Sequence, residues 1–277
     1  MRLQIKLFYT LLIMASLFSA CKEEQLVASD PKPQYVLPQG NHDYDKRIVA
    51  FYQKYKSFIL YKFSEADFNW NVTSRIKYVA TEGDPNYVEK SLNFLDKELF
   101  NYYDPQLLTS WMPYKILLCK NIHQLDQESK PLPEFADAAW TFTHIAFGHT
   151  DARWDTLTDT QKKRARGILH GALWATVGAR KKIQMAPKFI AGIDYTWIDQ
   201  NNYQSFGAFR LLNTAHEDLA EYVARITGYT KAEMDALFLN DTFDPTGIFR
   251  RKYNAVIDFY KTNYKIDLQA IGNSNIH

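Results

Sequence analysis

Residues 158–180 constrain the fold most strongly, because they predict one long helix. Thr158 and Gln161 have the spacing of a capping box, in which the two side chains satisfy free backbone N–H groups in the first turn. Further along, small and apolar residues recur at i, i+3, i+4 and i+7, the pattern of a helix with one face against a core. These residues are Ala165, Ile168, Leu169, Ala172, Leu173 and Thr176. The sequence therefore predicts a long helix, packed along one side, in the middle of the chain.

The same helix carries His170 and Trp174, whose spacing is that of the two histidines in a zinc-binding motif. They are four residues apart and so lie about 40° apart around a helix. Two histidines at this spacing, the first followed by glutamate, form the HExxH motif, in which the histidines bind zinc and the glutamate acts as the base. Here Gly171 stands in place of the glutamate and Trp174 in place of the second histidine. Catalytic zinc needs three protein ligands and a base beside the bound water, so the pattern leaves no catalytic residue in this motif.

The N-terminus predicts export and a lipid anchor. Arg2 and Lys6 precede an apolar run over residues 7–18, which is shorter than the about 20 residues that a membrane-spanning helix needs. Such a start is typical of a secretory signal peptide. Two small residues stand directly before Cys21, as at a lipoprotein processing site. We expect a cleaved signal peptide and a lipid on Cys21; a plain signal peptide with soluble export is the alternative.

This processing defines three parts of the chain. Residues 1–20 are the signal peptide, residues 21–42 are the lipidated cysteine and a flexible tether with three prolines, and residues 43–277 form a single domain. Cleavage removes two of the 33 basic residues and none of the 31 acidic ones, so the mature chain carries 31 of each. This balance argues against a nucleic-acid partner. The one other cysteine, Cys119, excludes a disulfide within the mature chain.

Predicted strands come early in the chain and predicted helices late. We expect strands at 58–63, 72–79, 116–119 and 138–147. We expect helices at 45–58, from 84 onward, at 158–180, from 214 onward, at 231–239 and at 248–264, with loops at 130–133 and 192–207. The predicted class is α+β, mostly helical with a small mixed sheet.

Several of these pieces, in this order, resemble one family. They are the aromatic segment 45–63, the strand at 138–147, the stretch LHGALWATVGARKK, the helix HEDLAEYVARI and the ending YKTNYKIDLQAI. Together they are similar to the zinc-binding metallopeptidase lipoproteins of Bacteroidota, also described as substrate-import-associated zinc metallohydrolase lipoproteins. The resemblance implies a zincin-like fold and a place on the cell-surface side of the outer membrane, beside TonB-dependent uptake systems of the SusC and SusD kind.

The resemblance also implies roles for individual residues. His170 matches the first zinc ligand, and Glu217 matches the third, with Glu221 as a substitute. With Gly171 and Trp174 in the remaining positions, the metal pair His170 and Glu217 is vestigial. We therefore expect no cofactor, and zinc only if the site functions. His170 has an alternative role as a core histidine bonded to Glu217 or to a tyrosine, and Glu217 has one as part of a capping box.

The leading hypothesis is a catalytically inactive outer-membrane lipoprotein that binds a ligand as an accessory component of nutrient uptake. The resemblance places the cleft at His170, Trp174 and Glu217, and aromatic residues suited to stacking on a peptide or glycan could form its rim. The rim candidates are Tyr195, Trp197 and Tyr203.

Two alternatives stay open. One is an active zinc metallohydrolase with a non-standard ligand set, and the other is a structural scaffold lipoprotein without a small ligand. The sequence does not identify the ligand, the partner proteins or the oligomeric state.

Overall fold

The computed structural model describes residues 34–69 and 76–277. The predictions for the signal peptide and for Cys21 lie outside the described residues, as does the first half of the strand predicted at 72–79. Residues 37–277 form one unit. Its first residues, which the sequence assigns to the tether, lie against the domain: the Gln39 side chain accepts a hydrogen bond from Tyr61 N (2.9 Å) and donates one to Lys62 O (2.6 Å).

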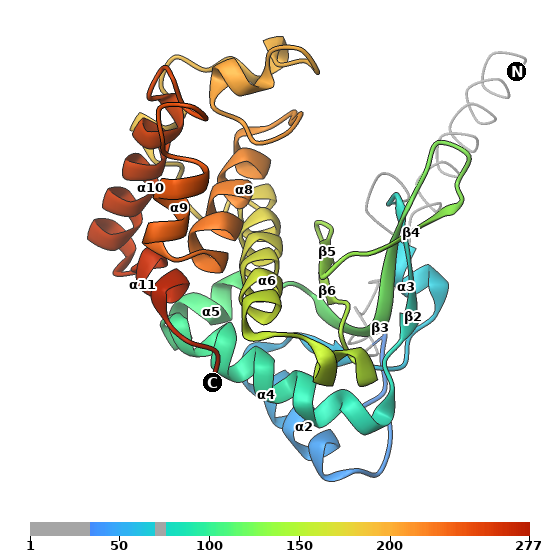
Figure 1. Cartoon of the computed structure of the whole chain (residues 1–277). Coiled ribbons are helices and arrows are strands. Elements are labelled where there is room, and N and C mark those ends of the chain that lie inside the picture. Colours follow the sequence, from blue (N-terminus) through green and yellow to red (C-terminus); the bar gives the residue numbers. More distant parts are fainter. Residues whose placement is uncertain (1–33, 70–75) are drawn as a thin grey trace, which may run out of the picture. The chain divides into compact units, whose positions relative to one another are not determined.

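The described residues confirm the α+β class, with helices predominating over a small mixed sheet (Figure 1). The α-helices are α2 (Asp43–Tyr55), α3 (Glu65–Asn69), α4 (Val88–Glu98), α5 (Pro105–Trp111), α6 (Asp159–Ala179), α7 (Pro187–Ile190), α8 (Ala215–Gly228), α9 (Lys231–Leu237), α10 (Ile248–Tyr264) and α11 (Leu268–Asn273). The 3₁₀ turns are η1 (Pro85–Tyr87), η2 (Phe100–Tyr102), η3 (Ala152–Thr156), η4 (Tyr195–Trp197) and η5 (Tyr203–Phe206). The strands are β1 (Phe58–Leu60), β2 (Tyr78–Glu82), β3 (Lys115–Leu125), β4 (Pro131–Phe135), β5 (Ala138–Trp140) and β6 (His144–Phe147).

Strand β3 organises the sheet. Its first half is buried and pairs in parallel with β1 and β6, while its second half pairs antiparallel with β2 and β4. The sequence predicted only the buried half, because the second half is partly buried or exposed except at Ile122. Residues 130–133 were expected to be a loop, which is wrong, because a strand begins at Pro131 and includes residues 131–135. This strand, β4, is exposed along its whole length, and an exposed edge strand tolerates its two prolines.

The segment 138–147 is a hairpin, whereas one continuous strand was predicted. Strands β5 and β6 pair antiparallel. The turn between them contains neither glycine nor proline and is closed by a side chain: Thr141 Oγ1 accepts hydrogen bonds from the backbone N–H groups of Thr143 and His144, both at 3.1 Å. Strand β5 lies at the edge of the sheet, next to α6 (Figure 1).

Helices α6 and α8 pack side by side along their lengths (Figure 1). The predicted capping box of Thr158 and Gln161 is present at the start of α6. Glycines permit the close approach: a Cβ on Gly167 would lie 2.2 Å from Ala224 O and 2.6 Å from Gly228 Cα. Gly228, the last residue of α8, is thus also a packing residue.

A charged residue at the start of α6 faces the interior. Four basic residues lie close together here, namely Lys162, Lys163, Arg164 and Arg166, and the last of them is fully buried. Its guanidinium pairs with the buried Glu98 (Nη1 to Oε2, 3.0 Å) and also donates to Thr227 O and Ser274 Oγ. Burying a charge is tolerated because it is paired and hydrogen-bonded.

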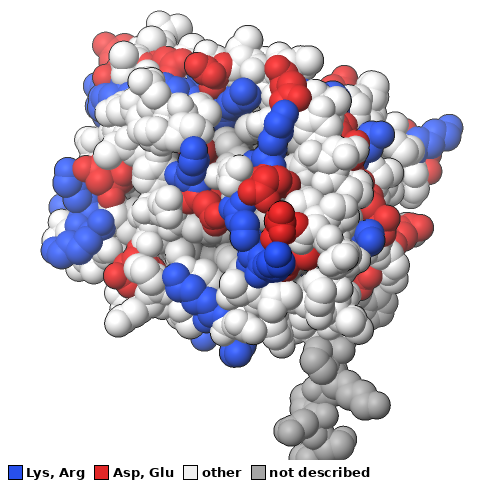
Figure 2. Space-filling model, turned by 90° about the horizontal axis from the view of Figure 1, so that it is seen from below, with Lys and Arg blue, Asp and Glu red and all other residues white. Residues whose placement is uncertain are grey.

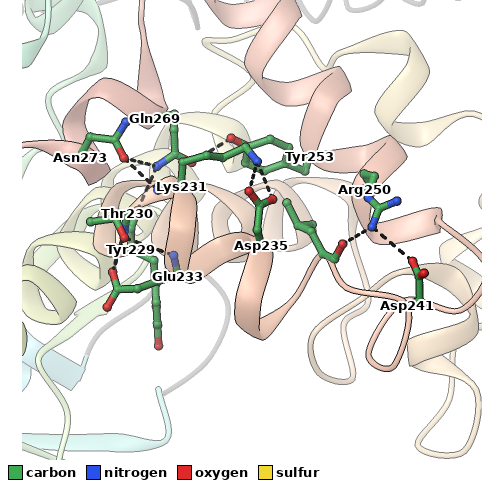
Figure 3. A network of polar contacts seen from close by, with 11 residues as sticks. Tyr229, Thr230, Lys231, Glu233, Asp235, Asp241, Arg250, Tyr253, Gln269 and Asn273 are labelled. Atoms are coloured by element: carbon green, nitrogen blue, oxygen red, sulfur yellow. Dashed lines mark hydrogen bonds and ion pairs between the residues drawn. The ribbon is translucent and has the colours of Figure 1, made fainter.

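The C-terminal helices are tied together by a polar network around α9 (Figure 3). Lys231 N donates to Asn273 Oδ1 (2.8 Å), and Gln269 Nε2 donates to Tyr229 O (3.0 Å). Tyr253 Oη donates to Gln269 Oε1 (2.9 Å), which links α10 to α11. These bonds hold α9, α10 and α11 to the end of α8.

The surface has no dominant charge on the face seen in Figure 2, where acidic and basic side chains are interspersed. None of the helices in the described part of the chain is long and apolar enough to cross a membrane.

Candidate functional site

His170 is fully buried and both of its ring nitrogens are hydrogen-bonded. Nε2 lies 2.8 Å from Glu98 O, which can only accept, so Nε2 carries the proton. Nδ1 lies 2.6 Å from Tyr103 Oη and therefore accepts from that hydroxyl. Burial, helped by the charge of Arg166 and opposed by the hydrogen bond to Glu98, lowers the pKa of His170 to about 3. The imidazole is neutral and fixed in one tautomer.

Trp174 belongs to the same hydrogen-bonded chain. It is fully buried, and its Nε1 donates to Tyr103 Oη (2.8 Å). The indole packs edge-on against Trp111 and Tyr260, with ring centroids 5.4 and 4.7 Å apart. The hydroxyl of Tyr103 thus accepts from Trp174 and donates to His170, and its pKa is raised because it is buried. The side chains of His170 and Trp174 are both buried in the core between α6 and the segment from the end of α4 to α5, away from solvent.

The residues expected as vestigial zinc ligands do not fit a zinc ion. His170 has no free nitrogen, and Glu217 lines a different part of the molecule. Glu217 bonds with the residues before α8: Thr214 Oγ1 donates to its carboxylate (2.8 Å), and its backbone N–H donates to Thr214 Oγ1 (3.3 Å). Within 34–69 and 76–277, no group of three or more His, Cys, Asp or Glu side chains is placed to hold a metal ion.

Gly171, at the position of the base, has a packing role. A Cβ there would lie 2.8 Å from Ala224 Cβ and 2.9 Å from Ala220 O, closer than real Cβ contacts. A glutamate cannot occupy this position while α6 and α8 keep their distance. The requirement for glycine is therefore explained by the contact between these helices.

A cleft of about 440 Å³ lies beside this contact, between the sheet and the pair α6–α8. Gly171, Ala172, Ala220 and Ala224 line its helical side, where their small size leaves room. Strand residues line the other side, and charged residues stand on both. The remaining lining residues are Tyr78, Gln124, Phe135, Ala136, Asp137, Ala138, Trp140, Ile168, Arg210, Glu217 and Glu221.

The cleft carries three carboxylates and one guanidinium. Arg210 Nε donates to Glu221 Oε1 (2.7 Å), and Arg225 Nη1 donates to Glu221 Oε2 (2.6 Å). Burial raises the pKa of Glu221, but the two guanidiniums outweigh it and hold the pKa below its usual value. Asp137 Oδ1 accepts from His149 Nε2 (2.6 Å).

The three aromatic rim candidates lie outside this cleft. Tyr195 is half-buried and donates to Asp218 Oδ2 (2.6 Å), Tyr203 is half-buried in η5, and Trp197 is 73% exposed. The aromatic residues that line the cleft are instead Tyr78, Phe135 and Trp140. Sequence reasoning missed them because they stand on strands whose pairing depends on distant segments.

A buried ion pair fixes the segment that carries the rim candidates. Lys252 Nζ lies 2.5 Å from Asp218 Oδ2 and donates to Gly207 O (2.9 Å), and both charged side chains are fully buried. Burial lowers the pKa of Lys252 and raises that of Asp218, while their mutual attraction opposes both changes. Residues 195–207 are thereby held against α8 and α10.

No family model matches the chain, and no curated protein matches it in sequence. One solved structure is similar in fold, a protein of Bacteroides caccae described as a "putative zinc-binding metallo-peptidase". The two share 14% identity over 83% of this chain and 88% of the other, with a TM-score of 0.49. No residue of this chain takes a role from that likeness.

Proposed function

We propose that this protein is an exported lipoprotein that binds a ligand in the cleft between the sheet and α6–α8 without hydrolysing it. It acts at the outer membrane as an accessory component of TonB-dependent nutrient uptake. The ligand is a peptide or a glycan, and binding requires no cofactor.

One observation carries the proposal. The side chains of His170 and Trp174 are buried and hydrogen-bonded in the core, while an adjacent cleft is open to solvent. The hydrogen-bonded chain from Trp174 through Tyr103 and His170 to Glu98 leaves no imidazole for a metal. The cleft, in contrast, combines small residues, aromatic rings and charged groups. Concave sites of this kind are typical of small-ligand binding.

The cellular setting is supported by the sequence alone. The apolar run at 7–18 followed by Cys21 supports a lipid anchor. The association with an uptake system rests on the resemblance of the chain to import-associated lipoproteins, which is an analogy rather than a property of any residue.

A ligand screen tests the binding function. The full chain, purified in detergent, is heated with peptides and oligosaccharides, because a ligand that binds only the folded state raises the melting temperature. We expect at least one ligand to raise it, and we expect Trp140→Ala to abolish that rise. Tyr203→Phe, outside the cleft, is the control. A screen with no response, or a response that Trp140→Ala leaves unchanged, would contradict a ligand-binding role for this cleft.

A further inference from the structure

The charges that line the cleft are not balanced within the protein. Glu221 pairs with the guanidiniums of Arg210 and Arg225, so the three carboxylates of the cleft stand against two basic side chains. Glu217 receives hydrogen bonds from two neutral donors, the Thr214 hydroxyl and the Asn213 backbone N–H. In the described part of the chain, no basic side chain pairs with this carboxylate at the wall of the cleft.

Asp137 adds a second acceptor on the strand side. One oxygen accepts from His149 Nε2. Among the described residues, no donor reaches the other oxygen, Asp137 Oδ2, and none reaches Glu217 Oε1. Two carboxylate oxygens are therefore available to a ligand, one from the strands and one from α8.

This charge distribution discriminates between ligand classes. A neutral ligand would displace water from Glu217 without replacing its charge, which is unfavourable. An anion would be repelled. A cation would compensate the carboxylate through charge-assisted hydrogen bonds, and Trp140 could add a cation–π contact.

We infer that the ligand binds this cleft through an organic cation, an ammonium or guanidinium group on an apolar stem. This inference rests on the proposed function and names the chemistry of its ligand. Glu217 is the principal acceptor and Asp137 the second, while the apolar stem lies along Ala172, Ala220 and the aromatic walls. A peptide supplies such a group from its N-terminal amine or from a lysine or arginine side chain, and the cleft volume suits a ligand of that size.

Calorimetric titration of the full chain in detergent tests this inference with four probes. The first is an N-acetylated tripeptide amide with a central lysine, and the second is a triglycine amide with a free amino terminus. The third is an N-acetylated triglycine amide without charge, and the fourth is a neutral trisaccharide. The first two probes distinguish a side-chain cation from a terminal one.

We expect at least one cationic probe to bind at least tenfold more tightly than the uncharged peptide. Glu217→Gln keeps the acceptor for Thr214 and removes the charge, so it should weaken cationic binding about tenfold. Asp258→Asn removes the same charge from the exposed face of α10 and should leave binding unchanged. Higher salt should weaken binding of the cationic probes.

Two outcomes overturn the inference. Equal binding of charged and uncharged peptides, or tight binding of the trisaccharide alone, shows that the cation is not the recognised group while the cleft still binds ligands. Absence of binding by all four probes also rejects the cation. The broader ligand screen, with its Trp140→Ala variant and Tyr203→Phe control, then decides separately whether the cleft binds ligands at all.

Discussion

At the scale of single residues, His170 shows how a motif-like position can have a structural role. Its neighbours in sequence resemble a decayed zinc motif, but its two partners, Glu98 and Tyr103, lie 72 and 67 residues away. Sequence reasoning foresaw a core histidine bonded to a tyrosine as one alternative. It could not identify that tyrosine, because the contact depends on the packing of α6 against the segment after α4.

Removal of the Tyr103 hydroxyl tests this hydrogen-bonded chain. Tyr103→Phe leaves His170 Nδ1 and Trp174 Nε1 buried without partners, and each unsatisfied group costs about 1–3 kcal/mol. We expect the free energy of unfolding, measured with urea, to fall by about 2–4 kcal/mol. Tyr203→Phe, at a half-buried residue, should change it by less than about 0.5 kcal/mol. Equal effects of the two substitutions would contradict the role of Tyr103.

The buried imidazole also predicts a pH dependence of stability. The pKa of His170 is about 3 in the folded protein and about 6.5 in the unfolded chain. Between these pH values the unfolded chain binds a proton at His170 and the folded protein does not. The contribution of the neutral imidazole to the free energy of unfolding is therefore full above pH 6.5 and is lost as the pH falls toward 3. We expect His170→Gln to reduce the slope of unfolding free energy between pH 4 and 6 by about 1.4 kcal/mol per pH unit. An unchanged slope would show that the imidazole protonates freely in the folded state.

At the scale of elements, prediction succeeded where local signals are strong. The bounds of α6 were predicted almost correctly from its capping box and its periodicity, and those of α10 from its periodicity. The hairpin β5–β6 was missed because its turn is closed by Thr141 rather than by glycine or proline. The buried Arg166 was missed because its partner Glu98 is distant in sequence. Gly167 and Gly171, four residues apart, were a readable signal of close helix packing.

Gly171→Ala tests the contact between α6 and α8. Alanine favours a helix over glycine by about 1 kcal/mol, but here its Cβ meets Ala224 and Ala220 at less than 3 Å. We expect a net loss of about 1–3 kcal/mol in unfolding free energy and a larger loss for Gly171→Glu. Ile168→Ala, at an exposed position of the same helix, serves as the control. A stabilised Gly171→Ala variant would mean that the helices are further apart than described.

At the scale of the whole molecule, the cleft lies where the strands and the pair α6–α8 leave a space between them. Its lining residues come from four strands (β2, β3, β4 and β5), from two loop segments and from the helices α6 and α8. No local pattern brings Glu217 together with Asp137 or Trp140, so the sequence could assign a cleft only by resemblance. That resemblance placed it at His170, Trp174 and Glu217, of which Glu217 lines the cleft while His170 and Trp174 are fully buried.

The buried pair of Asp218 and Lys252 joins α8, α10 and the segment 195–207. Removing one partner leaves the other buried and unpaired, which typically costs about 3–5 kcal/mol. We expect Asp218→Asn and Lys252→Met each to lower unfolding free energy by about this amount, and the double variant to recover part of the loss. Losses that simply add in the double variant would show that the two charges do not stabilise each other.

The most direct test of the central claim is the zinc content of the full chain, purified without chelator, beside that of His170→Ala. Since His170 has no free nitrogen and Glu217 lies apart from it, we predict zinc well below one ion per chain in both proteins. Added zinc should not change the melting temperature, and peptidase activity should be absent. About one zinc ion per chain in the wild type, lost together with hydrolysis in His170→Ala, would contradict this account and show an active metallohydrolase.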